Sequence, residues 1–175
     1  MKPAKPVKTN AARLLDSLGI AYEVRGYEVD PNDLSAVSVA RKIGLPAEQV
    51  FKTLLTRSAT GETAHLFAVI PGSEELDLKK LACAVSLKKI ELASLRDVEP
   101  LTGYVRGGVT VMGARTGFPA YADETIELHK VISVSAGLRG LQLLLTPADY
   151  LRATGAILAD LTKAASAAPG AEAHT

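Results

Sequence analysis

The chain has 175 residues, 47% of them hydrophobic, and its 20 basic and 19 acidic side chains leave a formal net charge of +1. This length and composition are typical of one globular domain with a core of its own. The balanced charge argues against non-specific coating of nucleic acid but allows a small basic groove. One cysteine excludes an internal disulfide, and no apolar run reaches the roughly 18 residues of a membrane span, so we expect a cytoplasmic protein.

Hydrophobic spacing predicts helices and strands that alternate along the chain. Helices are expected at residues 11–18, 36–43, 78–85 and 94–100, and a further one begins at Thr146. Apolar runs predict strands at residues 20–24, 50–56, 65–70, 89–92, 131–136 and 141–145. Residues 50–56 and 65–70 are expected to form a hairpin, as are residues 131–136 and 141–145. Hairpins mixed with helices favour one α/β or α+β domain around a mixed sheet.

Lys52 is out of place in the apolar run from Val50 to Leu55. Lysine is almost never fully buried without a partner. The side chain can lie at a strand edge with its ammonium in water. It can equally stand in the wall of a cleft, where it would bind a phosphate or a carbonyl oxygen.

The segment from Gly103 to Gly113 carries the paired glycines Gly107 and Gly108 beside Arg106. Glycines let a ligand approach the backbone closely, and successive amide groups can hold an anion or a developing oxyanion. Arg106 is suited to contact phosphate. The alternative is a tight turn or bulge, since glycine pairs are widespread.

A hairpin turn at residues 137–140 follows Ser133 and Ser135, which share one face of the predicted strand. These hydroxyls can bind a ligand or face water. Tyr27, after the first strand, can stack on a base or donate its hydroxyl, but a half-buried core tyrosine is an equal alternative.

Other reactive residue types do not form a recognisable site. Cys83 is expected to be a small core residue on a helix rather than a nucleophile. The three histidines are scattered, and no spacing of His, Cys and acidic residues predicts a metal site. We therefore expect no metal and no cofactor.

Three segments in order resemble the YbaK/EbsC family, whose members are related to the editing domain of bacterial prolyl-tRNA synthetases. They are Val50-Phe51-Lys52-Thr53-Leu54-Leu55, Gly103-Tyr104-Val105-Arg106-Gly107-Gly108 and Ser135-Ala136-Gly137-Leu138-Arg139-Gly140-Leu141. The resemblance implies a single α/β domain with a curved mixed sheet, or pseudo-barrel, and flanking helices. On this basis we expect a flexible arm at residues 1–8, an editing domain at residues 9–163 and a disordered tail at residues 164–175.

The resemblance also implies a function: hydrolysis of the ester between a wrong amino acid and transfer RNA, most simply cysteine on a proline transfer RNA. The substrate thiol would then attack its own ester. The expected partners are the acceptor end of the tRNA and, transiently, prolyl-tRNA synthetase. Lys52, Gly107 and Gly108 are the expected catalytic residues. The expected substrate-binding residues are Tyr27, Thr53, Arg106, Thr110, Ser135 and Gly137.

One departure leaves alternatives open. Thr110-Val111 stands where the family commonly has Ser-Pro, so the hydroxyl is kept and the rigid proline is lost. The enzyme can instead act on another small aminoacyl ester, such as alanyl, with water as the nucleophile. A non-catalytic module that binds RNA ends or a protein is the second alternative.

Overall fold

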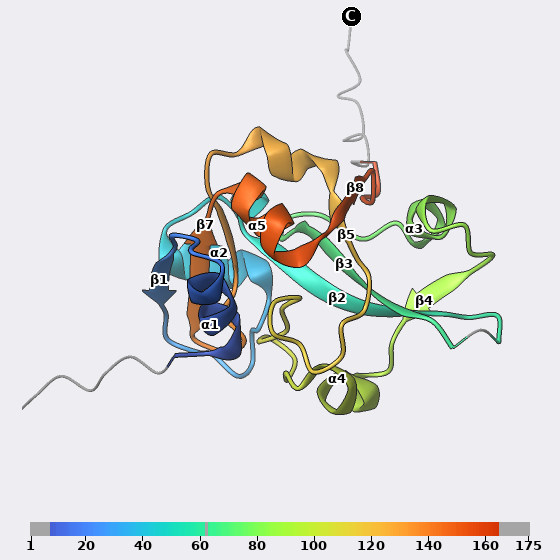
Figure 1. Cartoon of the computed structure of the whole chain (residues 1–175), viewed down its shortest axis with the longest axis horizontal. Coiled ribbons are helices and arrows are strands. Elements are labelled where there is room, and N and C mark those ends of the chain that lie inside the picture. Colours follow the sequence, from blue (N-terminus) through green and yellow to red (C-terminus); the bar gives the residue numbers. More distant parts are fainter. Residues whose placement is uncertain (1–7, 62, 165–175) are drawn as a thin grey trace, which may run out of the picture.

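Two β-sheets form the framework of the computed structural model, which describes residues 8–61 and 63–164 (Figure 1). The smaller sheet is antiparallel, in the order β1 (Glu23–Gly26), β7 (Leu141–Leu145) and β6 (Ile132–Ser135). The larger sheet has the order β4 (Ile90–Leu92), β2 (Phe51–Ser58), β3 (His65–Pro71), β5 (Ala120–Asp123) and β8 (Ile157–Ala159). It is mixed, because β5 runs parallel to both of its neighbours while β2 is antiparallel to β3 and β4.

A single parallel bridge between Val50 and Ser133 joins the two sheets. The predicted single α/β domain with mixed strand pairing is therefore confirmed. Its strands divide between two sheets, and within the described residues they do not close into a barrel. Of the predicted arm and tail, residues 1–7 and 165–175 lie outside the described residues.

In the described part of the chain, five short helices surround the sheets, and each begins at a side chain that accepts a backbone N–H bond. The helices are α1 (Asn10–Ser17), α2 (Ala36–Ile43), α3 (Leu78–Ala84), α4 (Leu95–Thr102) and α5 (Pro147–Thr154), with 3-10 turns η1 (Ala47–Gln49) and η2 (Glu124–Leu128). The capping residues are Thr9, Ser35, Asp77, Ser94 and Thr146. None of the helices in the described part of the chain has the length and apolar character to cross a bilayer.

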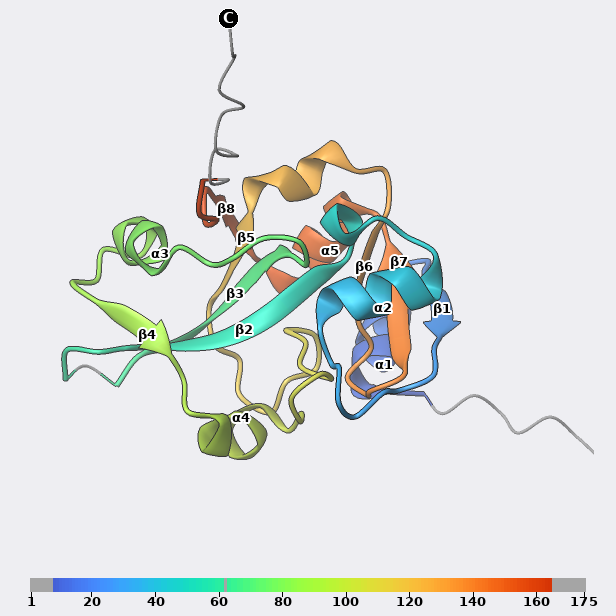
Figure 2. The ribbon, with the colours of Figure 1, turned by 180° about the vertical axis from the view of Figure 1, so that it is seen from behind.

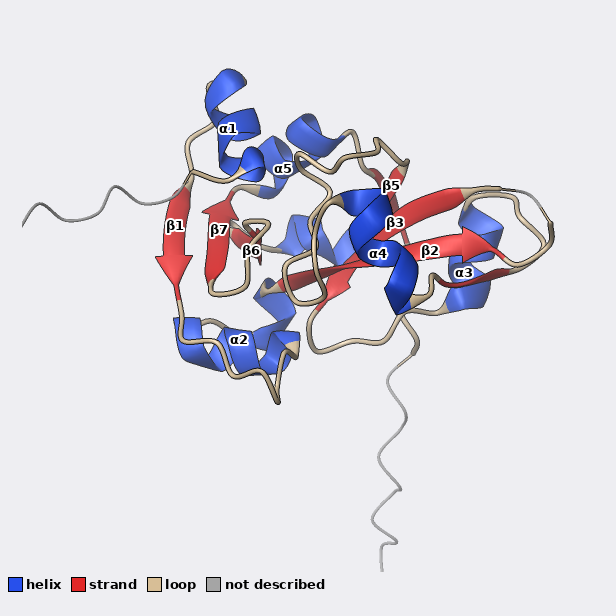
Figure 3. Ribbon diagram, turned by 90° about the horizontal axis from the view of Figure 1, so that it is seen from below, coloured by secondary structure: helices blue, strands red, loops and turns tan. Residues whose placement is uncertain are grey.

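The helices lie on different sides of the sheets. Figures 1 and 2 show α3 and α4 on opposite sides of the long β2–β3 hairpin. Figure 3 shows α1 near the start of β1 and α2 near its end. The hairpin thus has one side covered by α3 and another facing α2, α4 and the loop that follows α4.

Both predicted hairpins are present, but two strands and one side chain differ from expectation. β5 and β8 were not predicted, because their pairing with β3 and with each other, rather than a hydrophobic period, defines them as strands. The expectation that Cys83 is a core residue is wrong, since its side chain is exposed. The seven-residue helix α3 buries Leu81 and Ala82, and Cys83 lies on the side turned away from the core.

The glycine-rich loop after α4 is fixed to the β6–β7 turn by Tyr104. Its hydroxyl donates to the Met112 carbonyl across the loop at 2.7 Å. Its ring lies against Gly137, where a Cβ would come within 2.7 Å and where φ is +93°. Arg139 adds a bond from Nε to the Arg106 carbonyl at 2.7 Å. The two segments that the family resemblance singled out are therefore held together.

Gly72, directly after β3, is packed so tightly that no side chain fits. A Cβ there would lie 2.7 Å from the Ala36 Cβ and 2.9 Å from the Val50 carbonyl oxygen. The Gly72 N–H also donates to that Val50 carbonyl at 2.7 Å. The absence of a side chain lets the end of β3, the start of β2 and the N-terminus of α2 meet.

We expect Gly72→Ala to lower the free energy of unfolding by about 1–3 kcal/mol, the usual effect of overpacking. Urea denaturation followed by circular dichroism measures this change. Gly117→Ala is the matched control, because a Cβ at Gly117 meets nothing within 4 Å. Equal stability of the two variants would show that the Gly72 contact is not a packing constraint.

Candidate functional site

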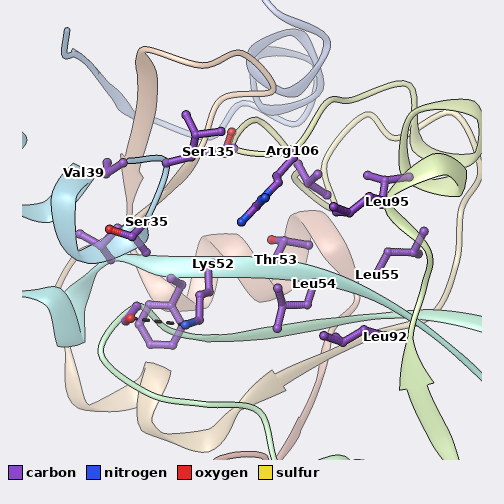
Figure 4. A pocket seen from close by; sticks show the side chains of 18 of the residues that line it. Ser35, Val39, Lys52, Thr53, Leu54, Leu55, Leu92, Leu95, Arg106 and Ser135 are labelled. Carbon is purple, nitrogen blue, oxygen red and sulfur yellow. Dashed lines mark hydrogen bonds between the residues drawn. The ribbon is translucent and has the colours of Figure 1, made fainter. Parts of the chain in front are cut away.

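A pocket of about 530 Å³ opens along one side of β2, between the N-terminus of α2, the start of α4 and the glycine-rich loop (Figure 4). Residues Val50 to Leu55 of the β2 segment form its floor. The loop contributes Arg106 and Gly107, and the β6–β7 hairpin contributes Ser135 and Gln142. A pocket of this size is within the range of small-molecule sites.

Lys52 lies in the wall of this pocket, half-buried, as the cleft alternative requires. Its Nζ donates a long hydrogen bond of 3.4 Å to the Gly72 carbonyl, drawn as the dashed line in Figure 4. Burial lowers the pKa of the Lys52 amine from its ordinary value, and the nearby Glu74 and Glu75 carboxylates oppose part of that shift. Among the described residues the ammonium therefore has one weak hydrogen bond, which a ligand can replace.

Arg106 extends its guanidinium into the pocket from the glycine-rich loop (Figure 4). The left-handed backbone of Gly107, with φ of +86°, lets the loop turn here beside Leu34. Gly107 lines the pocket, whereas Gly108 is buried against the Leu138–Arg139 backbone. The Gly108 N–H is already bonded to the Val105 carbonyl at 2.9 Å, so of the pair it is Gly107 that a ligand can approach.

The hydroxyls of Thr53 and Ser135 are the other predicted side chains in the lining. Ser135 Oγ accepts a bond from the Gly137 N–H at 3.1 Å, which leaves its own proton free to be donated. Across the hairpin Ser135 is paired with Gln142. Gln142 is buried, and its Oε1 accepts a bond of 2.9 Å from Ser133.

Other predicted substrate-binding residues lie outside the lining. Tyr27 packs half-buried beside α2, with the Lys42 amine 6.0 Å from the centre of its ring. Thr110 is fully buried, and its hydroxyl has no hydrogen-bond partner within the described residues. Gly137 supports the loop through Tyr104 rather than facing the pocket. Their contact with substrate remains a prediction.

Sequence reasoning missed several lining residues. Ser35, Gly72 and Gln142 were not among the predicted site residues, and nothing in the sequence assigned them to a shared pocket. Gln142 carried the best available signal, because a polar residue between leucines is as anomalous as Lys52.

The described lining of the pocket carries cationic and hydroxyl groups but no carboxylate, imidazole or thiol, since it contains no Asp, Glu, His or Cys. Within residues 8–61 and 63–164, no group of His, Cys, Asp and Glu could hold a metal ion. The site can therefore bind an anionic or carbonyl-bearing substrate and stabilise negative charge on it.

Sequence comparison places residues 30–153 in a known family, the aminoacyl-tRNA editing domain, and these residues include every lining side chain of the pocket. The chain belongs to this family.

Relatives of this editing domain carry names that refer to deacylation. The chain is 41% identical to a protein of Enterococcus faecalis named “Putative Cys-tRNA(Pro)/Cys-tRNA(Cys) deacylase EbsC”, over 89% of its own length and 93% of the relative. It is 29% identical to the Escherichia coli “Multifunctional Ser/Thr-tRNA deacylase ProXp-y”, over 79% and 83% of the two chains. A crystal structure described as “a putative trans-editing enzyme for prolyl tRNA synthetase” matches with a TM-score of 0.73 and 26% identity, over 92% and 99% of the chains. The editing-domain fold is thus shared across nearly the whole domain.

We expect Lys52→Met to raise the melting temperature of this editing domain near pH 7. The buried lysine has a pKa below its ordinary value of 10.5, so the folded state binds the proton less tightly than the unfolded state. The charged amine therefore lowers the free energy of unfolding at neutral pH, and methionine, which has no charge, removes this loss. As the pH rises from the lowered pKa toward 10.5 the amine loses its proton and the loss disappears, so the difference in melting temperature between the variant and wild type should shrink.

Differential scanning calorimetry between pH 7 and pH 10 measures this difference. Lys88→Met, at an exposed position away from the pocket, is the control. A melting temperature for Lys52→Met below that of wild type at pH 7 would contradict the account of a destabilising buried amine.

Proposed function

We propose that the protein is a trans-editing enzyme that hydrolyses the ester of mischarged aminoacyl-tRNA. The main substrate in this proposal is a proline tRNA that carries cysteine. The observation that carries the proposal is the Lys52 amine, partly desolvated and weakly bonded, in a pocket that also receives the Arg106 guanidinium. An aminoacyl ester is already activated, so positioning and charge stabilisation suffice for useful acceleration. Membership of the editing-domain family supports the same reaction class.

The two cations have different roles in this proposal. Lys52 lies deeper, beside Gly72, and would exchange its 3.4 Å contact for the carbonyl oxygen of the ester. Arg106 is on a more exposed loop and is suited to the phosphate before the terminal adenosine. The Gly107 backbone, which also lines the pocket, would approach the ester from the opposite side.

The attacking group in our proposal is the thiol of the substrate cysteine. The cysteine sulfur forms a bond to the ester carbonyl carbon, the bond from that carbon to the ribose oxygen breaks, and the proton ends on the ribose oxygen. Water then opens the resulting thiolactone to free cysteine. The described lining, without a Cys, His or carboxylate, is consistent with this route.

A route through water on seryl or threonyl esters is the second candidate. The E. coli relative named as a Ser/Thr-tRNA deacylase favours it. The pocket also presents the Ser135 hydroxyl and the Gln142 amide, which can bond a substrate hydroxyl.

Selection of the whole tRNA is proposed to come from a transient complex with prolyl-tRNA synthetase. The formal net charge of +1 leaves the domain with little general attraction for RNA. A solved relative described as a trans-editing enzyme for that synthetase supports this partner.

We expect Lys52→Ala to slow deacylation of a proline tRNA that carries cysteine by about 100-fold or more, because the cation that stabilises negative charge on the ester is removed. Single-turnover assays on cysteinyl, alanyl and seryl esters of one proline tRNA measure this effect. Activity on the cysteinyl ester alone indicates thiol assistance, whereas activity on all three indicates water.

Lys88→Ala should deacylate at the wild-type rate, since Lys88 is exposed and outside the pocket. A folded Lys52→Ala variant with normal turnover would refute the role of Lys52. Wild-type protein that binds tRNA ends but turns over none of the three esters would instead be a non-catalytic module.

We also expect a shallow salt dependence of tRNA binding, with a slope of log K against log salt of about −0.7, as for the one phosphate contact to single-stranded RNA that is assigned to Arg106. Arg106→Ala should reduce the slope by about 0.7, while Arg96→Ala, exposed on α4 outside the lining, should not. Binding titrations by fluorescence anisotropy from 50 to 200 mM salt measure both values. A slope several-fold steeper would mean that the domain itself contacts many phosphates of the tRNA body.

A further inference from the structure

The pocket has two halves of different chemistry. Its polar half holds Lys52, Gly72, Ser35, Ser135 and Gln142, and the apolar side chains of Ala36, Val39 and Val50 line it as well. Its other half, toward β4 and α4, is apolar, and Figure 4 shows the leucines of this half across the pocket from Ser35 and Lys52. The apolar half is lined by Leu54, Leu55, Leu92, Ala93, Leu95 and Val98.

Two leucines of the apolar half are open to solvent. Leu92 is 54% exposed at the end of β4, and Leu95 is 66% exposed at the start of α4. Local structure fixes both, because the Ala93 N–H bonds the Leu55 carbonyl at 3.0 Å and Ser94 caps α4. Isolated exposed leucines are common on protein surfaces, but these two adjoin a buried apolar floor inside a pocket.

We propose that this leucine shelf, formed by Leu92 and Leu95, binds the adenine of the terminal adenosine. The inference rests on the proposed function and orients its substrate. An aminoacyl-adenosine has a small polar amino-acid end and a flat purine end, joined through the ester. Purines stack on apolar as well as aromatic side chains, so the shelf matches the purine end.

The reverse orientation fits less well. An amino-acid subsite must exclude larger side chains, which requires closed walls. The polar half has such walls, since Val50 and Gly72 are buried and Gly72 admits not even a methyl group. The shelf is open, with Leu95 mostly exposed, and can select by surface contact but not by size. With the adenine on the shelf, the ester lies over Thr53, between Lys52 and Arg106.

The test uses adenosine 5′-monophosphate and ribose 5-phosphate as competitors of deacylation and as ligands in calorimetry. We expect wild-type protein to bind the nucleotide about 10-fold more tightly than the sugar phosphate, the lower end of a base-stacking contribution. A Leu92→Ala, Leu95→Ala double variant should lose this difference. It should also raise KM for aminoacyl-tRNA about 10-fold with kcat unchanged. Leu95→Ala alone should show part of the effect.

Leu128→Ala is the control, because Leu128 is 79% exposed and does not line the pocket. Equal binding of the two competitors by wild type, or an unchanged KM in the double variant, would overturn the proposal. So would a change in amino-acid preference with nucleotide binding intact, which would place the amino acid on the shelf. A defect seen only with prolyl-tRNA synthetase present would make the shelf a protein contact and also overturn it.

Nucleotide binding does not require turnover, so the two proposals fail separately. Wild-type protein that binds the nucleotide through the leucines but deacylates no aminoacyl-tRNA would refute the proposed function and support the adenine subsite. Turnover of aminoacyl-tRNA by a protein that binds the nucleotide no more tightly than the sugar phosphate would support the proposed function and refute the adenine subsite.

Discussion

The site depends on holding one amine partly out of water without giving it a strong partner. Lys52 lies between the apolar residues Val50 and Leu54 on one face of the strand, and its only hydrogen bond in the described structure is the 3.4 Å contact with the Gly72 carbonyl. Burial disfavours its charged form, and two nearby acids compensate only in part. In our proposal, a cation in this condition gains more from a substrate oxygen than a solvated lysine would.

That arrangement is built from contacts between distant parts of the chain. Gly72 brings the ends of β2 and β3 against α2, while Tyr104 and Arg139 fix the glycine-rich loop to the β6–β7 turn. The pocket is the space left between these two junctions. Its polar half adjoins the Gly72 junction, and its leucine shelf adjoins α4, so the fold itself separates the two ends of a substrate.

Local chemistry in the sequence was enough to predict both hairpins, the helix start at Thr146 and the anomalous Lys52, and it also singled out the glycine pair and Ser135 as candidates. The family resemblance then gave these residues expected roles. Neither could reveal that Gly72 faces Ala36, that Gln142 borders the pocket, or that Leu92 and Leu95 share an exposed shelf, because these relations are set by tertiary contacts. Cys83 was mistaken for a core residue because its neighbours in the helix are apolar, although the spacing of Leu78, Leu81 and Val85 places it off their face. β5 and β8 were missed because their pairing, not their sequence, defines them.

The most direct test is a crystal structure of the protein with cysteinyl-adenosine in which an amide replaces the ester, so that the ligand cannot be cleaved. The account predicts that Lys52 Nζ leaves the Gly72 carbonyl and bonds the ligand's carbonyl oxygen at about 2.7–3.0 Å. A ligand bound in the pocket while Lys52 remains on Gly72, or a ligand bound outside the pocket, would contradict it.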